Sequence, residues 1–246
     1  MRIFAKLTLT EIRLFLREPV AAFFVLVFPT LLVIILGSIP SFREPSADIG
    51  GRRVIDLYVS IAVVLTLAMV AIQVAPAVLA TYRERGVLRR LATTPVSPLK
   101  MLGAQLAMNG IAAVVSTTLV LAVGRIVFDV RLAQQFAGFV LAFLLTLAGT
   151  LAIGLFVAAV VPSGKTGNAI GTVLFFPLMF FAGLWTPREV MPEILQRIAD
   201  FTPLGAGQRA LSEAMTGSWP NLLSATVLVG YLAVFGFAAV RSFRWS

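Results

Sequence analysis

The hydrophobic residues of this chain lie in six long blocks that are separated by polar segments. The blocks lack the periodicity of a half-solvated helix, and each is close to the about 20 apolar residues that a helix needs to cross the bilayer core. We therefore predict an all-α integral membrane protein with six transmembrane helices in a single domain, residues 1–246. The predicted spans are about 20–39, 57–80, 101–123, 136–161, 169–185 and 222–240.

Two of these blocks depart from the simplest pattern. The first starts after nineteen residues and lacks a small-x-small cleavage site, so we expect it to stay in the protein rather than be removed as a signal peptide. The fifth, 169–185, has 17 residues and contains Pro177. Because proline removes a helical hydrogen bond, we expect this helix to be broken or steeply continued by the segment after it.

The cytoplasmic segment 1–19 predicts an amphipathic helix that lies on the membrane surface. At about 100° per residue, its basic side chains share one narrow sector, opposite an apolar one. The basic residues are Arg2, Lys6, Arg13 and Arg17, and the apolar residues are Phe4, Leu7, Leu14 and Phe15. Such a helix either anchors to anionic lipid or also contacts a cytoplasmic subunit. Glu11 and Glu18 lie on the apolar side, which favours a protein contact or an arginine partner.

The polar segment 186–221 is long and contains two stretches with helical periodicity before the last span. Ile194, Leu195, Ile198 and Phe201 repeat at helical spacing in the first, and the second runs near 206–215. Trp185 and Trp219 flank the segment, as expected of residues at the headgroup level. We interpret it as interfacial or re-entrant outer helices; an ordinary folded outer loop is the alternative.

The distribution of positive charge predicts the orientation in the membrane. With six spans, both termini share a side, and the segments on that side contain 12 of the 20 Lys and Arg residues. These segments are 1–19, 81–100, 162–168 and 241–246. The positive-inside rule therefore predicts cytoplasmic termini and a cytoplasmic connector 81–100. Because topology explains the excess positive charge, we expect no nucleic-acid partner.

Composition excludes several kinds of chemistry. The chain is 59% hydrophobic and 13% charged, against roughly 45–50% and about 25% in soluble domains. It has no Cys and no His, which removes disulfides, thiol chemistry, imidazole catalysis and the usual zinc sites. The predicted spans contain no acidic or basic residue, so an intramembrane enzyme lacks acid–base groups. We expect no catalytic residue and no metal site.

The link 162–168 contains Gly164-Lys165-Thr166, which matches the end of a phosphate-binding loop. The full pattern requires a glycine where Ala159 stands, and it follows a buried strand rather than a membrane span. A capped turn between two spans is the better interpretation.

The connector 81–100 is basic and is interrupted by two prolines. Its residues 84–92 can form a short helix with Val87, Leu88 and Leu91 on one side, and Gly86 permits close backbone approach. Thr94-Pro95 and Ser97-Pro98 are candidate helix starts, and we expect the second to begin the third span. From chemistry alone, the connector is either a short rigid helix that fits a groove on a soluble partner or a solvated positive loop.

The run from Glu84 to Pro98, ERGVLRRLATTPVSP, resembles the signature of ATP-binding-cassette (ABC) transporter permeases of the ABC type-2 class, and most closely the drug and antibiotic exporter branch. The stretch from Phe181 to Pro192, FAGLWTPREVMP, followed by Thr202-Pro203-Leu204, also resembles that class. The two motifs and the six spans extend over nearly the whole chain. Many members have threonine in place of Val87 and glutamate in place of Arg89. Because this chain differs at both positions, the resemblance does not identify the substrate.

The resemblance implies that the connector carries a coupling helix that docks into a separate ATPase subunit. Its expected coupling residues are Glu84, Arg85, Gly86, Val87, Leu88, Arg89, Leu91, Pro95, Ser97 and Pro98. The N-terminal helix is expected to abut the same subunit. The implied complex contains two ATPases, which bind ATP and Mg²⁺, and two permease protomers, identical or different. We expect it in the bacterial cytoplasmic membrane, exporting a drug, an antibiotic or a lipid; a glycan or lipid-linked exporter is the alternative.

The span residues offer few candidates for lining a pathway. Gln73, Gln105 and Asn109 are the most polar, and interhelical hydrogen bonding is the alternative role for them. Phe176 and Phe180 belong to an aromatic patch that either contacts substrate or packs against lipid or a second protomer. Ion-coupled carriers usually place charges inside the membrane, so the uncharged spans disfavour that rival function.

Overall fold

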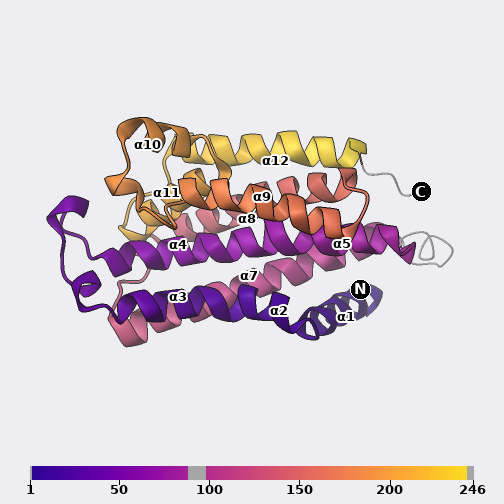
Figure 1. Ribbon diagram of the computed structural model, residues 1–246, viewed down its shortest axis with the longest axis horizontal. Helices are drawn as coiled ribbons and strands as arrows, with labels where there is room; N and C mark the ends of the chain where they lie inside the picture. Colours follow the sequence, from indigo (N-terminus) through magenta and orange to yellow (C-terminus); the bar gives the residue numbers. More distant parts are fainter. Residues whose placement is uncertain (1, 88–97, 243–246) are drawn as a thin grey trace.

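The computed structural model describes residues 2–87 and 98–242, which form helices joined by short loops (Figure 1). The α-helices are α1 (Arg2–Leu16), α2 (Pro19–Ala22), α3 (Phe28–Gly37), α4 (Val54–Ala68), α5 (Ala75–Glu84), α7 (Pro98–Phe128), α8 (Phe136–Val160), α9 (Gly164–Phe181), α10 (Glu193–Asp200), α11 (Pro203–Met215) and α12 (Leu222–Ser242). Short 3-10 turns lie in the loops at Pro40–Arg43, Ala47–Ile49 and Arg188–Val190. The prediction of an all-helical protein is confirmed for the described residues.

Five helical stretches in this described part are long and apolar enough to cross a membrane. They are Pro19–Gly37, Val54–Glu84, Leu99–Phe128, Phe136–Val160 and Leu222–Ser242. Each overlaps one predicted span, and the second and third extend beyond the prediction at both ends. The chain is therefore a multi-pass membrane protein.

A further helix, α9, takes the place of the fifth predicted span but is not among these five stretches. It starts and ends earlier than the predicted range 169–185, and its first turns carry Lys165 and Asn168, which lower its average hydropathy. Pro177 lies inside α9 without interrupting it, so the expectation of a broken helix is wrong. The count of six spans stays a prediction.

The first two spans each contain a π-helical turn that the sequence did not reveal. Phe23–Val27 joins α2 to α3, and Met69–Val74 joins α4 to α5. In both cases a proline follows the π-helical turn and leaves a carbonyl without its helical N–H partner. For Pro29 that carbonyl belongs to Val25, and it accepts a hydrogen bond of 2.7 Å from the Ser116 hydroxyl on α7.

The second span lies at the centre of the bundle and is almost entirely buried. Glycines let neighbouring helices approach its π-helical turn. A Cβ at Gly154 of α8 would lie 1.9 Å from the carbonyl oxygen of Ala71, and one at Gly171 of α9 would lie 2.4 Å from that of Ile72. Because lipid tails are as apolar as the side chains, such close packing, rather than the hydrophobic effect, holds the spans together.

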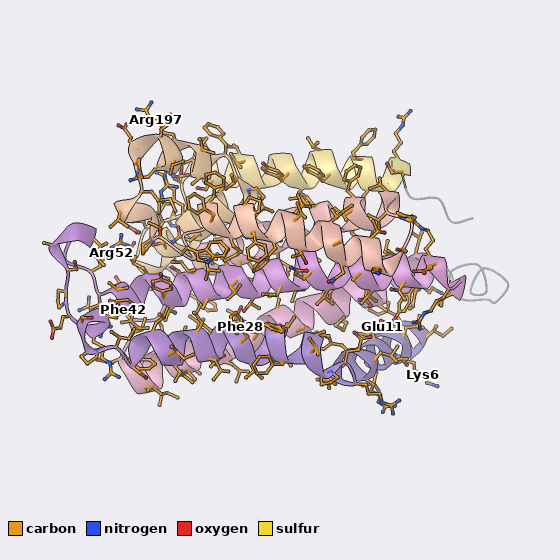
Figure 2. The ribbon with its side chains drawn as sticks, in the orientation of Figure 1. Lys6, Glu11, Phe28, Phe42, Arg52 and Arg197 are labelled. Carbon is orange, nitrogen blue, oxygen red and sulfur yellow. The ribbon has the colours of Figure 1, made fainter. Side chains whose placement is uncertain are left out.

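The two ends of the bundle differ from its middle. The start of α1, the end of α5 and the end of α12 lie at one end, and α10 lies at the other with the loop between α3 and α4 (Figure 1). Figure 2 shows Lys6 and Glu11 toward the first end, Arg52 and Arg197 at the second, and Phe28 between them. Charged ends and an apolar middle are what a membrane-spanning bundle requires.

Candidate functional site

Helix α5 ends where the basic connector begins. Its last residue is Glu84, Arg85 forms the C-cap, and Gly86 has a left-handed φ of 66°. That conformation is costly for residues with a side chain, so the glycine ends the helix. Among the described residues, nothing lies within 4 Å of the position that a Cβ would take, so the close backbone approach expected at Gly86 stays a prediction. The turn at Arg85 and Gly86 therefore separates Glu84 from the rest of the predicted helix 84–92, of which residues 88–92 lie outside the described part of the chain.

Two oppositely charged residues in the last turn of α5 form hydrogen bonds with the connection between α8 and α9. The Arg83 guanidinium donates a hydrogen bond of 2.6 Å to the carbonyl oxygen of Ala159, in the last turn of α8. The Glu84 carboxylate accepts one of 3.0 Å from the backbone N–H of Gly164, the first residue of α9. A cation at a helix C-terminus and an anion at an N-terminus both match the helix dipoles. We call these two contacts the α5 clamp.

The turn held by the α5 clamp also packs tightly against α5. A Cβ at Gly164 would lie 1.9 Å from the Thr81 hydroxyl oxygen, so any other residue there would force the Thr81 side chain away from its hydrogen bond to the Ala77 carbonyl. Ser163 caps α9, because its side chain accepts a hydrogen bond of 3.2 Å from the N–H of Thr166. The run 164–166 is therefore the first turn of a capped helix, as the interpretation as a capped turn between two spans predicts.

Helix α1 is attached to the same turn of α5. The Tyr82 hydroxyl donates a hydrogen bond of 2.9 Å to the Glu11 carboxylate, and the Glu11 side chain is buried. Glu11 shares its face of α1 with Thr8 and Phe15, which are also buried. Burial raises the pKa of Glu11, and the hydrogen bond from Tyr82 offsets this only in part. The acidic residue therefore has a protein partner, as the sequence favoured, but the partner is a tyrosine of the same chain.

The remaining surface of α1 is exposed and amphipathic. Lys6, Arg13 and Arg17 are exposed on the side opposite the buried face, while apolar residues such as Leu9 and Leu16 are also exposed. Glu18 is exposed at the junction with α2. The side chain of Arg2 lies outside what the structure describes. An interfacial helix of this kind needs both charged and apolar exposed sides.

Half of the expected coupling residues lie outside the described part of the chain. Those that the structure does not describe are Leu88, Arg89, Leu91, Pro95 and Ser97. Pro98 is the first residue of α7, so the predicted start of the third span is confirmed. Proline at this position suits a helix start, because the first N–H groups have no intrahelical acceptor.

A groove of about 620 Å³ opens between the first span and α9, beside the π-helical turns of the first two spans. Aromatic and aliphatic side chains form most of its wall, among them Phe24, Phe28, Met69, Phe175, Phe176 and Trp185. Phe176 stacks on Trp185, with ring centroids 5.9 Å apart. Gln73 also lines the groove and accepts a hydrogen bond of 3.4 Å from Thr172 of α9. We call this feature the lateral groove.

The other predicted pathway residues do not line the lateral groove. Gln105 and Asn109 on α7 are fully buried, and their amide atoms have no hydrogen-bond partner among the described residues. Gln105 borders a different cavity, between α1, α5 and α7. Phe180 is half-buried and packs edge-to-face on Phe181 at 5.4 Å.

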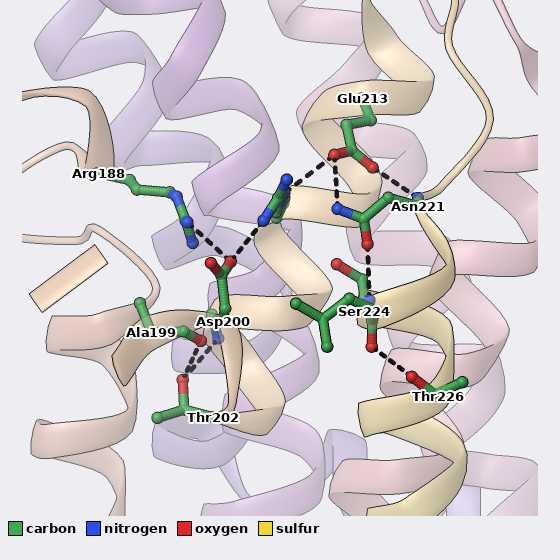
Figure 3. Close-up of polar contacts among 11 residues, drawn as sticks. Arg188, Ala199, Asp200, Thr202, Glu213, Asn221, Ser224 and Thr226 are labelled. Atoms are coloured by element: carbon green, nitrogen blue, oxygen red, sulfur yellow. Dashed lines mark hydrogen bonds and ion pairs between the residues drawn. The ribbon is translucent and has the colours of Figure 1, made fainter. Parts of the chain in front are cut away.

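At the opposite end of the bundle, an ion-pair network joins α10, α11 and the segments that flank them (Figure 3). Asp200 pairs with Arg188 at 2.7 Å and with Arg209 at 2.9 Å. Arg209 also pairs with Glu213 at 3.0 Å, and Glu213 accepts a hydrogen bond of 2.8 Å from the backbone N–H of Asn221. Partial burial acts to raise the pKa of Asp200, but the hydrogen bonds from the two arginines outweigh it and hold the pKa below its usual range.

Sequence reasoning missed this outer network, although it placed two helical stretches in the segment 186–221. Only the Arg209–Glu213 pair has a visible i,i+4 spacing. The other contacts depend on the turn at Thr202, whose hydroxyl caps α11 by accepting a hydrogen bond of 3.2 Å from the N–H of Gly205. Most of α11 is buried against α8, α12, α4 and α9. Whether these helices are interfacial or re-entrant stays a prediction.

No group of three or more His, Cys, Asp or Glu side chains within residues 2–87 and 98–242 is arranged to hold a metal ion.

Residues 3–216 match the family described as ABC-2 type transporter. The chain is similar to the transport permease YvfS of Bacillus subtilis (strain 168), with 28% identity over 159 residues, 62% of this chain and 62% of that protein. It is also similar to the inner membrane transport permease YhhJ of Escherichia coli (strain K12), with 26% identity over 187 residues, 73% of this chain and 50% of that protein. The chain thus spans about half to three fifths of the length of these relatives.

Proposed function

The chain belongs to the ABC-2 type transporter family, and on this premise we propose that it is the membrane subunit of an ATP-driven exporter. A separate ATPase subunit supplies the hydrolysis and docks on the connector 81–100. The family match extends over both motifs that carried the resemblance, from Glu84 to Pro98 and from Phe181 to Pro192.

One observation carries this proposal: the last turn of α5, next to the connector, is tied to three other helices. Tyr82 holds α1, Arg83 holds the end of α8, and Glu84 holds the start of α9. A displacement of the connector therefore reaches several helices through short polar contacts. Coupling between distant sites requires such a rigid connection to an element with two arrangements.

The route from the connector to the lateral groove runs through α9. Glu84 contacts the first residue of α9, and Asn168, Thr172 and Phe176 of the same helix line the groove. In the proposed cycle, ATP binding draws two ATPases together and pushes the connector. The α5 clamp passes this movement to α9, which opens the pathway toward the outer leaflet.

The lateral groove indicates the kind of substrate. Its wall is mostly apolar, and Gln73, Asn168 and Thr172 supply a few polar groups. Sites of this composition suit amphipathic or lipophilic molecules, because apolar walls provide contact area and a few polar groups set the orientation. We propose that Gln73 and Phe176 line the pathway for a drug, an antibiotic or a lipid. The positions of Gln105, Asn109 and Phe180 give less support to that role.

The distribution of charge supports an ATP-driven exporter over an ion-coupled carrier. In the described spans, acidic and basic residues lie only near the helix ends, at Asp56, Arg83 and Glu84 in the second span, for example. Ion-coupled carriers usually place such residues within the membrane.

The proposed complex contains two copies of the ATPase, which bind ATP and Mg²⁺, and two permease protomers. One bundle supplies one lateral groove and thus half of a pathway, so a second, identical or different permease completes it. We place the complex in the bacterial cytoplasmic membrane with both termini in the cytoplasm. The shared position of the start of α1 and the end of α12 supports this topology (Figure 1).

Reconstitution of this chain with a candidate ATP-binding subunit tests the proposal. ATP hydrolysis by the complex in liposomes is measured with lipophilic drugs, antibiotics, phospholipids and lipid-linked glycans as separate additions. We expect stimulation by an amphipathic compound, reduced in Phe176→Ala and unchanged in Phe237→Ala on the exposed side of α12. Transport by the permease alone, driven by an ion gradient, would refute the proposal.

A further inference from the structure

A second cavity, of about 430 Å³, lies between α1, α5 and α7. Its inner part is bordered by Glu11, Tyr82 and Gln105, and its mouth by Arg17, Glu18 and Arg85. The apolar side chains of Leu14, Val74, Val78 and Met108 complete the wall. We call this feature the α1 cavity.

Gln105 indicates that a polar molecule belongs in the α1 cavity. Its side chain is fully buried, and neither its amide nitrogen nor its carbonyl oxygen has a partner among the described residues. Asn109, one turn further along α7, is in the same state. A buried amide without partners is costly, so such groups normally mark a bound water or ligand. A molecule that satisfies Gln105 must offer both a donor and an acceptor.

The mouth of the α1 cavity narrows the choice of ligand. Arg17, Glu18 and Arg85 are exposed there, so the mouth carries both signs of charge. The cavity lies where the interfacial helix α1 packs on the start of α7, which is the headgroup level of the inner leaflet in the proposed topology. An apolar wall beneath a mouth of mixed charge is complementary to a zwitterionic lipid.

We propose that the α1 cavity binds a phospholipid with a primary ammonium headgroup, of the phosphatidylethanolamine type. The phosphate is placed near Arg17 and accepts a hydrogen bond from the Gln105 amide. The ammonium donates to the Gln105 carbonyl and faces the carboxylates of Glu11 and Glu18. A choline headgroup lacks ammonium N–H donors, and a glycerol headgroup lacks the positive charge. The bound lipid would help to hold α1 on α5 and α7, independently of which substrate is exported.

Native mass spectrometry of the full-length protein, released from micelles that contain equal amounts of three phospholipids with identical chains, tests this site. The three headgroups are ethanolamine, choline and glycerol. We expect retention of the ethanolamine lipid about tenfold above either competitor, the discrimination that one charge-assisted hydrogen bond provides. In Gln105→Leu the preference should disappear, whereas Gln73→Leu, which removes an amide from the lateral groove, should keep it.

Thermal unfolding supplies the second readout and shows whether the Gln105→Leu variant is folded. Gln105→Leu removes a buried polar group without partners, so the delipidated variant should be at least as stable as the delipidated wild type. Added ethanolamine lipid should raise the melting temperature of the wild type but not of Gln105→Leu. Equal retention of all three lipids, or an unchanged preference in Gln105→Leu, would overturn the proposal and assign the cavity to water.

Discussion

Glu84, the last residue of α5, accepts a hydrogen bond of 3.0 Å from the backbone N–H of Gly164, the first residue of α9. The contact joins residues 80 positions apart and lies beside the break at Gly86 that separates α5 from the connector. Through it, the segment that we assign to the ATPase meets the helix that lines the lateral groove.

Removing the carboxylate of Glu84 should uncouple ATP hydrolysis from substrate export. In Glu84→Ala we expect the number of substrate molecules exported per ATP hydrolysed to fall severalfold, while membrane insertion and assembly with the ATPase persist. The stability cost should be about 1 kcal/mol or less, because the side chain is exposed. Glu84→Gln keeps an acceptor oxygen and should be milder. Glu44→Gln, an exposed acid in the loop at the other end, serves as the control; an equal ratio in Glu84→Ala and this control would contradict the role of the clamp.

The turn at Gly86 should tolerate residues according to their left-handed propensity. Gly86→Val places a β-branched side chain at a φ of 66°, at a cost of about 1–2 kcal/mol, and should shift the angle at which the connector leaves α5. Asparagine adopts this conformation more readily, so Gly86→Asn should keep most of the coupling. Among the described residues, the space around Gly86 is open, so backbone strain rather than a clash within this part of the chain is the expected cause. If Gly86→Val and the wild type exported the same amount of substrate per ATP hydrolysed, the turn at Gly86 would have no role in coupling.

Packing of α8 on the second span should be sensitive to a single methyl group at Gly154. A Cβ there would meet the backbone carbonyl of Ala71, which cannot rotate away, at 1.9 Å. Gly154→Ala should therefore lower the free energy of unfolding by about 1–3 kcal/mol or more. Gly110 of α7 has nothing within 4 Å of its Cβ position, so Gly110→Ala should be neutral or stabilising by about 0.5–1 kcal/mol. Reversible unfolding in micelles measures both, and equal effects would contradict this contact between the two helices.

The outer ion-pair network should weaken in acid. The pKa of Asp200 is lower in the folded protein than in the unfolded chain, so its ionised form stabilises the fold. This contribution is complete above the unfolded value of about 3.9 and is lost as the pH falls through the folded pKa. Asp200→Asn leaves Arg188 and Arg209 without this carboxylate and should cost about 1–3 kcal/mol at pH 7.

Thermal melting of wild type and Asp200→Asn from pH 7 to pH 3 checks that prediction. The difference in melting temperature should be constant down to about pH 5 and shrink below about pH 4. Asp129→Asn, whose partner Arg125 and own side chain are both largely exposed, should show little difference at any pH. A wild-type advantage that grows in acid would reverse the assigned sign.

The spans within the long apolar blocks could be predicted from the sequence, because the length of a span depends only on consecutive residues. The limits of α9 were not, since Lys165 and Asn168 lower the hydropathy of its first turns while their helix packs against α5. The family resemblance was confirmed by the match over residues 3–216.

The polar contacts of the candidate site could not be predicted from consecutive residues. Glu11 stood out as an acid on an apolar face, but its partner Tyr82 is 71 positions away and is brought close only when α1 packs into the folded bundle. The π-helical turns depend on tertiary partners too, such as the Ser116 hydroxyl that satisfies the carbonyl of Val25. The spacing of residues along the chain does not predict such contacts.

Photocrosslinking in intact cells tests the central claim, that a nucleotide-hydrolysing partner contacts the connector where α5 ends. A photoreactive residue is placed at Val87, and, as a control, at Ile194 on the exposed side of α10 at the other end of the bundle. We predict an adduct with an ATPase subunit from position 87 and none from position 194. Absence of an ATPase adduct at position 87, or modification of a cysteine placed there by a membrane-impermeant reagent added outside the cell, would contradict the account.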